Sequence, residues 1–133
     1  MSAPEAQSAK GTLFRIERKE GKAPGTVIFR FSGPFTAREM YGHLTPRALE
    51  DMLNFQSTPD EKAPAVNILD LTEVPYMDSA GLGILIKHSV RCKGKGLRLF
   101  AVGVTPRVMQ LFLLTKADAV IPIATSIEEV DKH

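Results

Sequence analysis

Two short stretches near the start of the chain alternate hydrophobic and polar residues. Residues 12–18 read TLFRIER and residues 26–31 read TVIFRF, and alternation of this kind is typical of strands with one packed face. The segment between them, EGKAPG, holds two glycines and a proline, which favour a turn. The pattern therefore predicts an opening hairpin of two antiparallel strands.

Two helix starts follow this hairpin. Thr36 and Glu39 have the spacing of a capping box, which predicts a short helical turn within residues 34–42. Thr45 followed by Pro46 predicts the start of a second, longer helix. That helix carries a mostly apolar stripe at helical spacing, formed by Leu49, Met52, Leu53 and Gln56. We interpret the stripe as core packing.

The middle of the chain alternates strands with helices. Residues 65–71 (AVNILDL) and 97–102 (LRLFAV) are nearly continuous apolar runs, as in strands covered on both faces. Residues 79–93 between them have a helical pattern that ends at two glycines. Together they predict a βαβ unit with a right-handed crossover.

The last third of the chain adds three elements. Thr105, again followed by Pro and Arg, predicts a helix to about residue 115, and residues 119–123 predict a short last strand. Ser126 and Glu129 form a second capping box, which predicts a terminal helix.

The order of elements is therefore β-β-α-β-α-β-α-β-α. It predicts an α/β sandwich in which an N-terminal hairpin joins a mainly parallel mixed sheet with about four helices. A length of 133 residues fits one domain. We assign residues 12–133 to that domain and expect residues 1–11 to be a disordered lead.

Composition removes several classes of function. The formal net charge of +2 is too balanced to indicate a nucleic-acid or membrane partner. The single cysteine, Cys92, excludes an internal disulfide, and we expect it to be buried. The start of the chain lacks the features of a secretory signal, and no apolar run is long enough for a membrane span. We expect a cytoplasmic protein without a cofactor or metal.

The most informative stretch is the junction between residues 69 and 86, read LDLTEVPYMDSAGLGILI. Asp78 and Ser79 stand where a strand gives way to a helix, and both are good helix-capping residues. Gly81 and Gly83 follow in the first turns, where each costs roughly 1 kcal/mol relative to alanine. A purely structural helix does not need them. We expect these glycines to leave the backbone uncovered, so that a partner or an enzyme can approach Ser79.

The same helix predicts two faces. Its inner face is expected to consist of Leu82, Leu85, Ile86, Ser89 and Val90. A docking face is expected on another side and at the preceding turn. Its predicted partner-binding residues are Tyr76, Met77, Asp78, Ser79, Gly81, Gly83, Ile84, Lys87 and Arg91.

The sequence MDSAGLGILI after the strand end DLTEVPY resembles the STAS domain, the fold of bacterial anti-sigma factor antagonists. The hallmark of that family is an Asp-Ser-(Ser/Ala/Thr)-Gly-Leu-Gly motif. The resemblance extends over about residues 12–130, including the opening hairpin, GLRLFAVG, TPRVMQLFLLTKAD and VIPIATSIEEV.

The resemblance implies a regulatory cycle. In that family the motif serine, matched here by Ser79, is phosphorylated by an anti-sigma factor with serine kinase activity, and a serine phosphatase reverses the reaction. Unphosphorylated protein would bind the kinase and free a sigma factor, and phosphorylated protein would be released. The protein would not be an enzyme.

The same residues are compatible with two other functions. A structural STAS subunit of a transporter or stress-signalling scaffold would use the motif for contact without phosphate cycling. Binding of a small ligand or nucleotide at the strand ends is a third hypothesis. Lys87, Arg91, Lys93, Lys95 and Arg98 form one basic cluster, which is either a solvated face or a contact for an acidic partner. A metal site or a Ser-His-Asp triad is disfavoured, because the acidic residues and histidines lack the required spacing.

Overall fold

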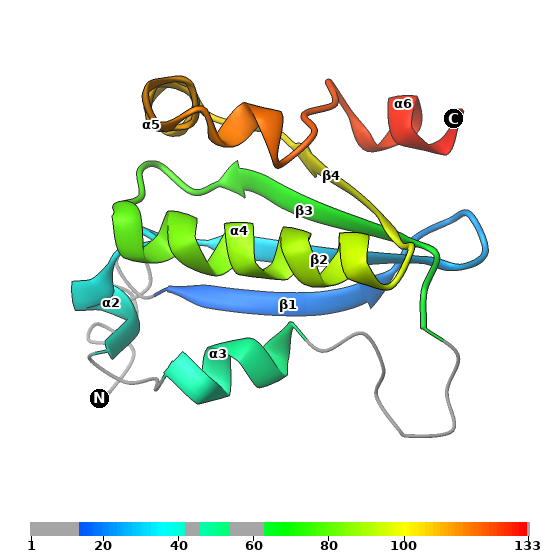
Figure 1. Ribbon diagram of the computed structural model, residues 1–133, viewed down its shortest axis with the longest axis horizontal. Helices are drawn as coiled ribbons and strands as arrows, with labels where there is room; N and C mark the ends of the chain where they lie inside the picture. The colour runs from blue at the N-terminus through cyan, green and yellow to red at the C-terminus, as the bar shows by residue number, and fades with distance from the viewer. Residues whose placement is uncertain (1–13, 42–45, 54–62, 133) are drawn as a thin grey trace, which may run out of the picture.

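The computed structural model describes residues 14–41, 46–53 and 63–132 and contains a four-stranded sheet in the order β1-β2-β3-β4 (Figure 1). The strands are β1 (Arg15–Glu20), β2 (Thr26–Ser32), β3 (Val66–Glu73) and β4 (Arg98–Val102). The pairing of β1 with β2 is antiparallel, whereas β2 with β3 and β3 with β4 are parallel. The predicted hairpin and mainly parallel sheet are confirmed. In this strand order β1 and β4 are the two edge strands.

Five helices accompany the sheet in the described residues. They are α2 (Ala37–Tyr41), α3 (Pro46–Met52), α4 (Ser79–Gly94), α5 (Pro106–Thr115) and α6 (Ile127–Asp131), with the short 3-10 helix η1 (Ala117–Ala119) after α5. In both predicted capping boxes the serine or threonine hydroxyl caps its helix: the Glu39 N–H donates to Thr36 Oγ1 at 3.3 Å, and the Glu129 N–H donates to Ser126 Oγ at 3.1 Å. None of the helices described is long and apolar enough to cross a membrane.

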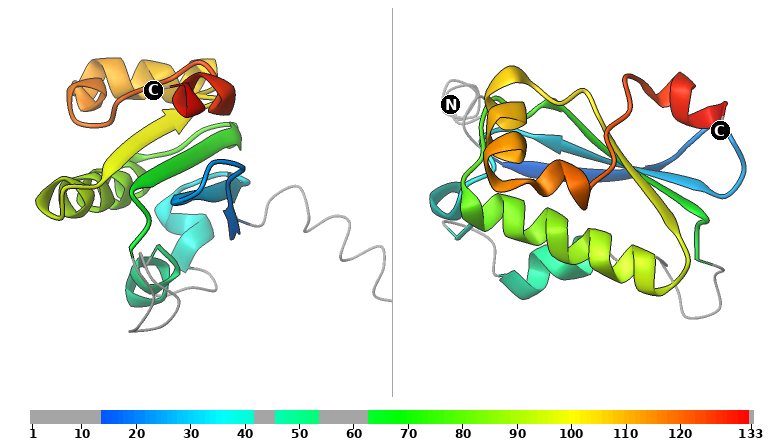
Figure 2. Two further views of the ribbon diagram at one scale, coloured as in Figure 1. Left: turned by 90° about the vertical axis from the view of Figure 1, so that its right-hand side faces the viewer. Right: turned by 45° about the horizontal axis from the view of Figure 1, so that its top comes forward.

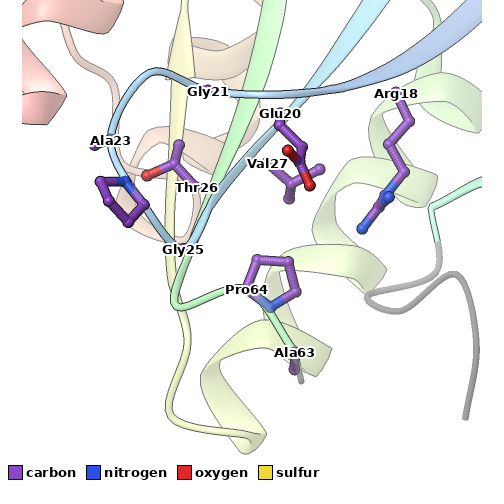
Figure 3. Close-up of a pocket in the computed structure, with 10 residues that line it drawn as sticks. Arg18, Glu20, Gly21, Ala23, Gly25, Thr26, Val27, Ala63 and Pro64 are labelled. Atoms are coloured by element: carbon purple, nitrogen blue, oxygen red, sulfur yellow. The ribbon is translucent and has the colours of Figure 1, made fainter. Parts of the chain in front are cut away.

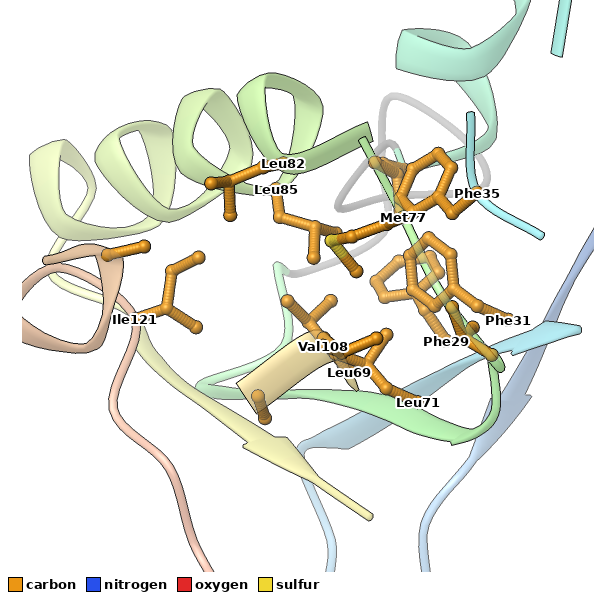
Figure 4. Close-up of a cluster of buried hydrophobic side chains, with 14 of the residues drawn as sticks. Phe29, Phe31, Phe35, Leu69, Leu71, Met77, Leu82, Leu85, Val108 and Ile121 are labelled. Carbon is orange, nitrogen blue, oxygen red and sulfur yellow. The ribbon is translucent and has the colours of Figure 1, made fainter. Parts of the chain in front are cut away.

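The sheet separates two apolar clusters. The larger one lies between the sheet and helices α2 to α5, and Figure 4 shows its centre, where Leu82 and Leu85 of α4 approach Phe29 and Leu69. The smaller one lies on the other face, where Ile28, Ile68 and Val102 form one cluster with Val130 of α6. The buried Leu49 and Leu53 confirm core packing for the α3 stripe, whereas Thr45 and Gln56 lie outside the described residues.

The predicted strand at residues 119–123 is wrong. Lys116 ends α5 in the left-handed conformation with φ of 62°, and the chain continues directly into η1. The Ile121 N–H then bonds back to the Ala117 carbonyl at 2.8 Å, which takes it away from any strand ladder. All that pairs with β4 here is an isolated bridge between Ile123 and Ala101.

One predicted cap has another role. Thr105 precedes α5, but its side chain makes no capping hydrogen bond. Its hydroxyl instead donates to the Val74 carbonyl oxygen at 2.8 Å. Thr105 therefore ties the loop after β4 to the loop after β3, two segments that meet because β3 and β4 are parallel neighbours.

Candidate functional site

The junction between β3 and α4 is held by the segment that follows β2. The Phe35 N–H donates to the Tyr76 carbonyl at 3.0 Å, and the Asp78 N–H donates to the Phe35 carbonyl at 3.2 Å. Phe35 itself is fully buried and stacks on Phe14, with 4.4 Å between ring centroids. The loop that leads to Ser79 is thus fixed by backbone pairing on one side and by core packing beneath it.

Asp78 is the N-cap of α4. Its Oδ1 accepts from the N–H groups of Ala80 and Gly81 at 3.0 and 3.1 Å, and its Oδ2 accepts from the Ala37 N–H at 3.0 Å. One carboxylate therefore satisfies free N–H groups at the start of α4 and at the start of α2. Its negative charge is also favourable at a helix N-terminus.

Ser79 is the first residue of α4 and is exposed to solvent. Because Asp78 caps the helix, the Ser79 hydroxyl is not needed for that purpose. The structure therefore leaves the side chain at the surface, beside a carboxylate, at the end of a stiff junction.

The two motif glycines have different surroundings, and the expectation that both uncover the backbone is wrong for Gly81. Gly81 is buried, and a Cβ there would lie 2.9 Å from Phe35 Cγ and also against the Phe35 carbonyl oxygen. Gly83 is exposed, and a Cβ there would have no neighbour within 4 Å. Gly81 is required for close packing of α4 on Phe35, and only Gly83 leaves an open surface.

An exposed stripe runs along α4 from Ser79. Gly83, Lys87 and Val90 follow at spacings of three or four residues, and all are exposed, Val90 by 57%. Val90 was predicted on the inner face, which is wrong: its place there is taken by the buried His88 and Cys92. Two further predicted docking residues, Ile84 and Arg91, are half-buried on the flank of the stripe.

The turn before α4 divides its side chains between core and surface. Met77 is 8% exposed and points into the apolar cluster in Figure 4, so the prediction that it lies on the docking surface is wrong. Tyr76 is 37% exposed, and the Arg107 guanidinium lies over its ring with Cζ 4.7 Å from the centroid. Such a contact contributes about 0.5–1 kcal/mol at exposed sites.

Arg107 was not among the residues predicted for the site. Its signal in the sequence is the Thr-Pro-Arg start of α5, which follows β4 as the Ser79 motif follows β3. The carboxyl ends of parallel neighbours meet at one edge of a sheet, so residues after them can come together. The hydrogen bond from the Thr105 hydroxyl to the Val74 carbonyl joins the two segments directly.

His88 and Cys92 occupy the inner side of α4. They are 2% and 1% exposed, and Cys92 Sγ lies 3.7 Å from His88 Nε2. Burial lowers the pKa of His88 to about 4, and the positive charge of Arg91 acts in the same direction. Burial raises the pKa of the Cys92 thiol to about 11, so this cysteine is a buried, protonated side chain, as predicted.

The buried histidine makes stability depend on pH. The pKa of His88 is 6.5 in the unfolded chain and about 4 in the folded one. Between these values only the unfolded state binds the proton, so the free energy of unfolding falls as pH falls. The loss is expected to be about 2 kcal/mol between about pH 7 and about pH 5. Urea unfolding at both pH values should show a smaller loss for His88→Gln, and an equal loss would contradict this assignment.

A pocket lies at the end of the sheet opposite Ser79, and Figure 3 shows the residues that line it. Its volume is about 220 Å³, and it lies between the β1–β2 turn and Ala63 and Pro64, which precede β3. Ser79 follows the other end of β3. The pocket therefore takes no part in the site described above.

This chain is similar in sequence to a known domain family and to a named relative. The family model described as the STAS domain matches residues 19–130. An anti-sigma-B factor antagonist from Listeria monocytogenes is 32% identical over 89 residues, which are 67% of this chain and 75% of that protein.

Two solved structures are similar in fold. An anti-sigma factor antagonist from Mycobacterium paratuberculosis is 23% identical with a TM-score of 0.62, over 86% of this chain and 90% of that one. A sulfate transporter family protein from Wolinella succinogenes is 23% identical with a TM-score of 0.63, over 83% of this chain and 84% of that one.

Proposed function

Because this chain belongs to the STAS domain family, we propose that it is an anti-sigma factor antagonist controlled by phosphorylation of Ser79. In the unphosphorylated form it binds an anti-sigma factor with serine kinase activity and frees a sigma factor in the cytoplasm. Transfer of phosphate to Ser79 releases that partner, and a serine phosphatase restores binding. The chain itself carries out no catalysis in this cycle.

The observation that carries this proposal is the exposure of Ser79 directly after the capping residue Asp78. A kinase can reach the hydroxyl without unfolding the helix. The backbone hydrogen bonds of Phe35 hold the loop before Ser79, so the hydroxyl has a defined position beside Asp78. Gly83, one turn further along α4, leaves room for the surface of a partner.

The release step follows from charge. A phosphate adds about −1.5 to −2 charges at pH 7. Asp78 Oδ1 already occupies the N–H groups of Ala80 and Gly81. The phosphate therefore meets a carboxylate where a helix N-terminus would otherwise offer hydrogen bonds. A partner packed against Ser79 would have to bury both negative groups, which weakens binding without any refolding of the domain.

Phosphate transfer itself can be tested by mass spectrometry. Purified chain incubated with ATP and the anti-sigma factor kinases of its source organism is expected to gain the mass of one phosphate at Ser79. Ser79→Ala is the control and is expected to gain none. Phosphate on another residue, or none with any of these kinases, would contradict the proposed cycle.

The second candidate is a structural subunit of a transporter or stress-signalling scaffold. The observation that supports this candidate is the similar fold of the sulfate transporter family protein. The two functions differ in the mass measurement, because a structural subunit binds through the motif but does not cycle phosphate. Stable binding of a partner by both the wild type and Ser79→Asp, without phosphate transfer, would favour this second function.

A further inference from the structure

A groove runs along the outer edge of β4, between the second half of α4 and the segment around η1. It consists of two adjoining hollows of about 350 and about 480 Å³, which share Ser89, Lys93, Ala119 and Val120. The first reaches along β4 to Pro122, and the second extends to Val90 and Gly94. Figure 2 (right) shows η1 beside α4 at this place.

The two walls of the groove are held at a fixed separation. Ser89 of α4 donates from its hydroxyl to the Val120 carbonyl oxygen at 2.8 Å. On the other side, the Ala101 N–H donates to the Pro122 carbonyl at 2.8 Å, and the Ala124 N–H donates to the Ala101 carbonyl at 2.9 Å. The groove is therefore already formed in the unbound chain, which lowers the cost of ordering on binding.

The walls are apolar and the rim is basic. Val90 and Val120 face solvent from opposite walls, with exposures of 57% and 43%. Two cationic side chains, Lys93 and Arg98, line the same groove, and none of its described lining residues is acidic. The Arg98 guanidinium lies over the Phe100 ring, with Cζ 5.0 Å from the centroid. Exposed apolar walls with a polar rim are typical of protein interaction sites.

We propose that this groove docks a short acidic segment of a partner protein, with an apolar side chain inserted between Val90 and Val120 and carboxylates beside Lys93 and Arg98. The positive rim selects an acidic occupant through charge complementarity. This assigns part of the basic cluster of α4 and β4 to a binding site.

The groove lies at the other end of α4 from Ser79 and meets the exposed stripe of α4 at Val90. Lys93 lies 14 residues after Ser79 on the same helix, which corresponds to roughly 20 Å at 1.5 Å per residue. Binding in the groove can therefore be measured without the phosphorylation site. It adds a second attachment point at the other end of α4.

The proposal can be tested with two labelled peptides, Glu-Glu-Leu-Phe-Glu-Glu and Lys-Lys-Leu-Phe-Lys-Lys. In fluorescence anisotropy titrations the acidic peptide is expected to bind saturably and the basic one at least about tenfold more weakly. Amide shifts in NMR spectra are expected to map the acidic peptide to Val90, Lys93 and Val120.

Matched variants separate the groove from general charge. Lys93→Glu and Val90→Asp change exposed groove residues. Each is expected to lower the affinity for the acidic peptide about tenfold. Lys19→Glu makes the same charge change on β1, the far edge of the sheet, and is expected to leave affinity unchanged. Equal binding of both peptides, or equal effects of Lys93→Glu and Lys19→Glu, would overturn the proposal. Thermal melts of each variant verify that the fold is retained.

Discussion

Replacing Gly81 with alanine is expected to lower the free energy of unfolding by about 1–3 kcal/mol, although alanine is the better helix former. The added Cβ would lie 2.9 Å from Phe35 Cγ and against the Phe35 carbonyl oxygen, which accepts from the Asp78 N–H. Phe35 is fully buried in the core, so neither group can move aside cheaply. Urea denaturation monitored by circular dichroism would measure the loss.

Gly83→Ala is the matched control, two residues along the same helix. A Cβ there meets nothing within 4 Å, so only helix propensity changes. The free energy of unfolding is expected to rise by roughly 0.5–1 kcal/mol. If both substitutions stabilised the protein, the close approach of Phe35 would not be the reason for glycine at position 81.

Replacing Ser79 with aspartate is expected to weaken binding of the anti-sigma factor partner by roughly tenfold to a hundredfold, or about 1.4–2.7 kcal/mol. The substitution places a second carboxylate next to Asp78 at the start of α4, where a partner would have to bury both. Isothermal titration calorimetry with the purified partner would measure the loss. The loss of affinity should become smaller as ionic strength rises, because part of it comes from repulsion between exposed charges, which salt screens.

Ser79→Ala provides the control for that measurement. It removes the hydroxyl without adding charge and is expected to keep wild-type affinity. Because Asp78, not Ser79, caps α4, both variants should unfold within about 0.5 kcal/mol of the wild type. Equal affinities of Ser79→Asp and Ser79→Ala for the partner would contradict an electrostatic release mechanism.

Much of the fold follows from local patterns in the sequence. The alternating strands near the start, the apolar runs of β3 and β4, and the hydroxyl caps at Thr36 and Ser126 all form as predicted, since each depends on neighbours within a few residues. The strand predicted at residues 119–123 does not form, although the β-branched residues of this segment favour a strand locally. The left-handed Lys116 and the bond from Ile121 to Ala117 decide otherwise.

The candidate site divides in the same way. The sequence alone determined that Asp78 and Ser79 begin a helix after a central strand, because capping and strand preferences are local. Which of the motif residues are accessible depends on long-range contacts that the folded chain makes. Gly81 and Met77 are buried at this junction, where Phe35, more than 40 residues earlier in the chain, packs. Arg107 contacts Tyr76 from the start of α5. Contacts between residues so distant in sequence depend on how the sheet brings its loops together, so a local pattern can mark the segments involved but does not pair their side chains.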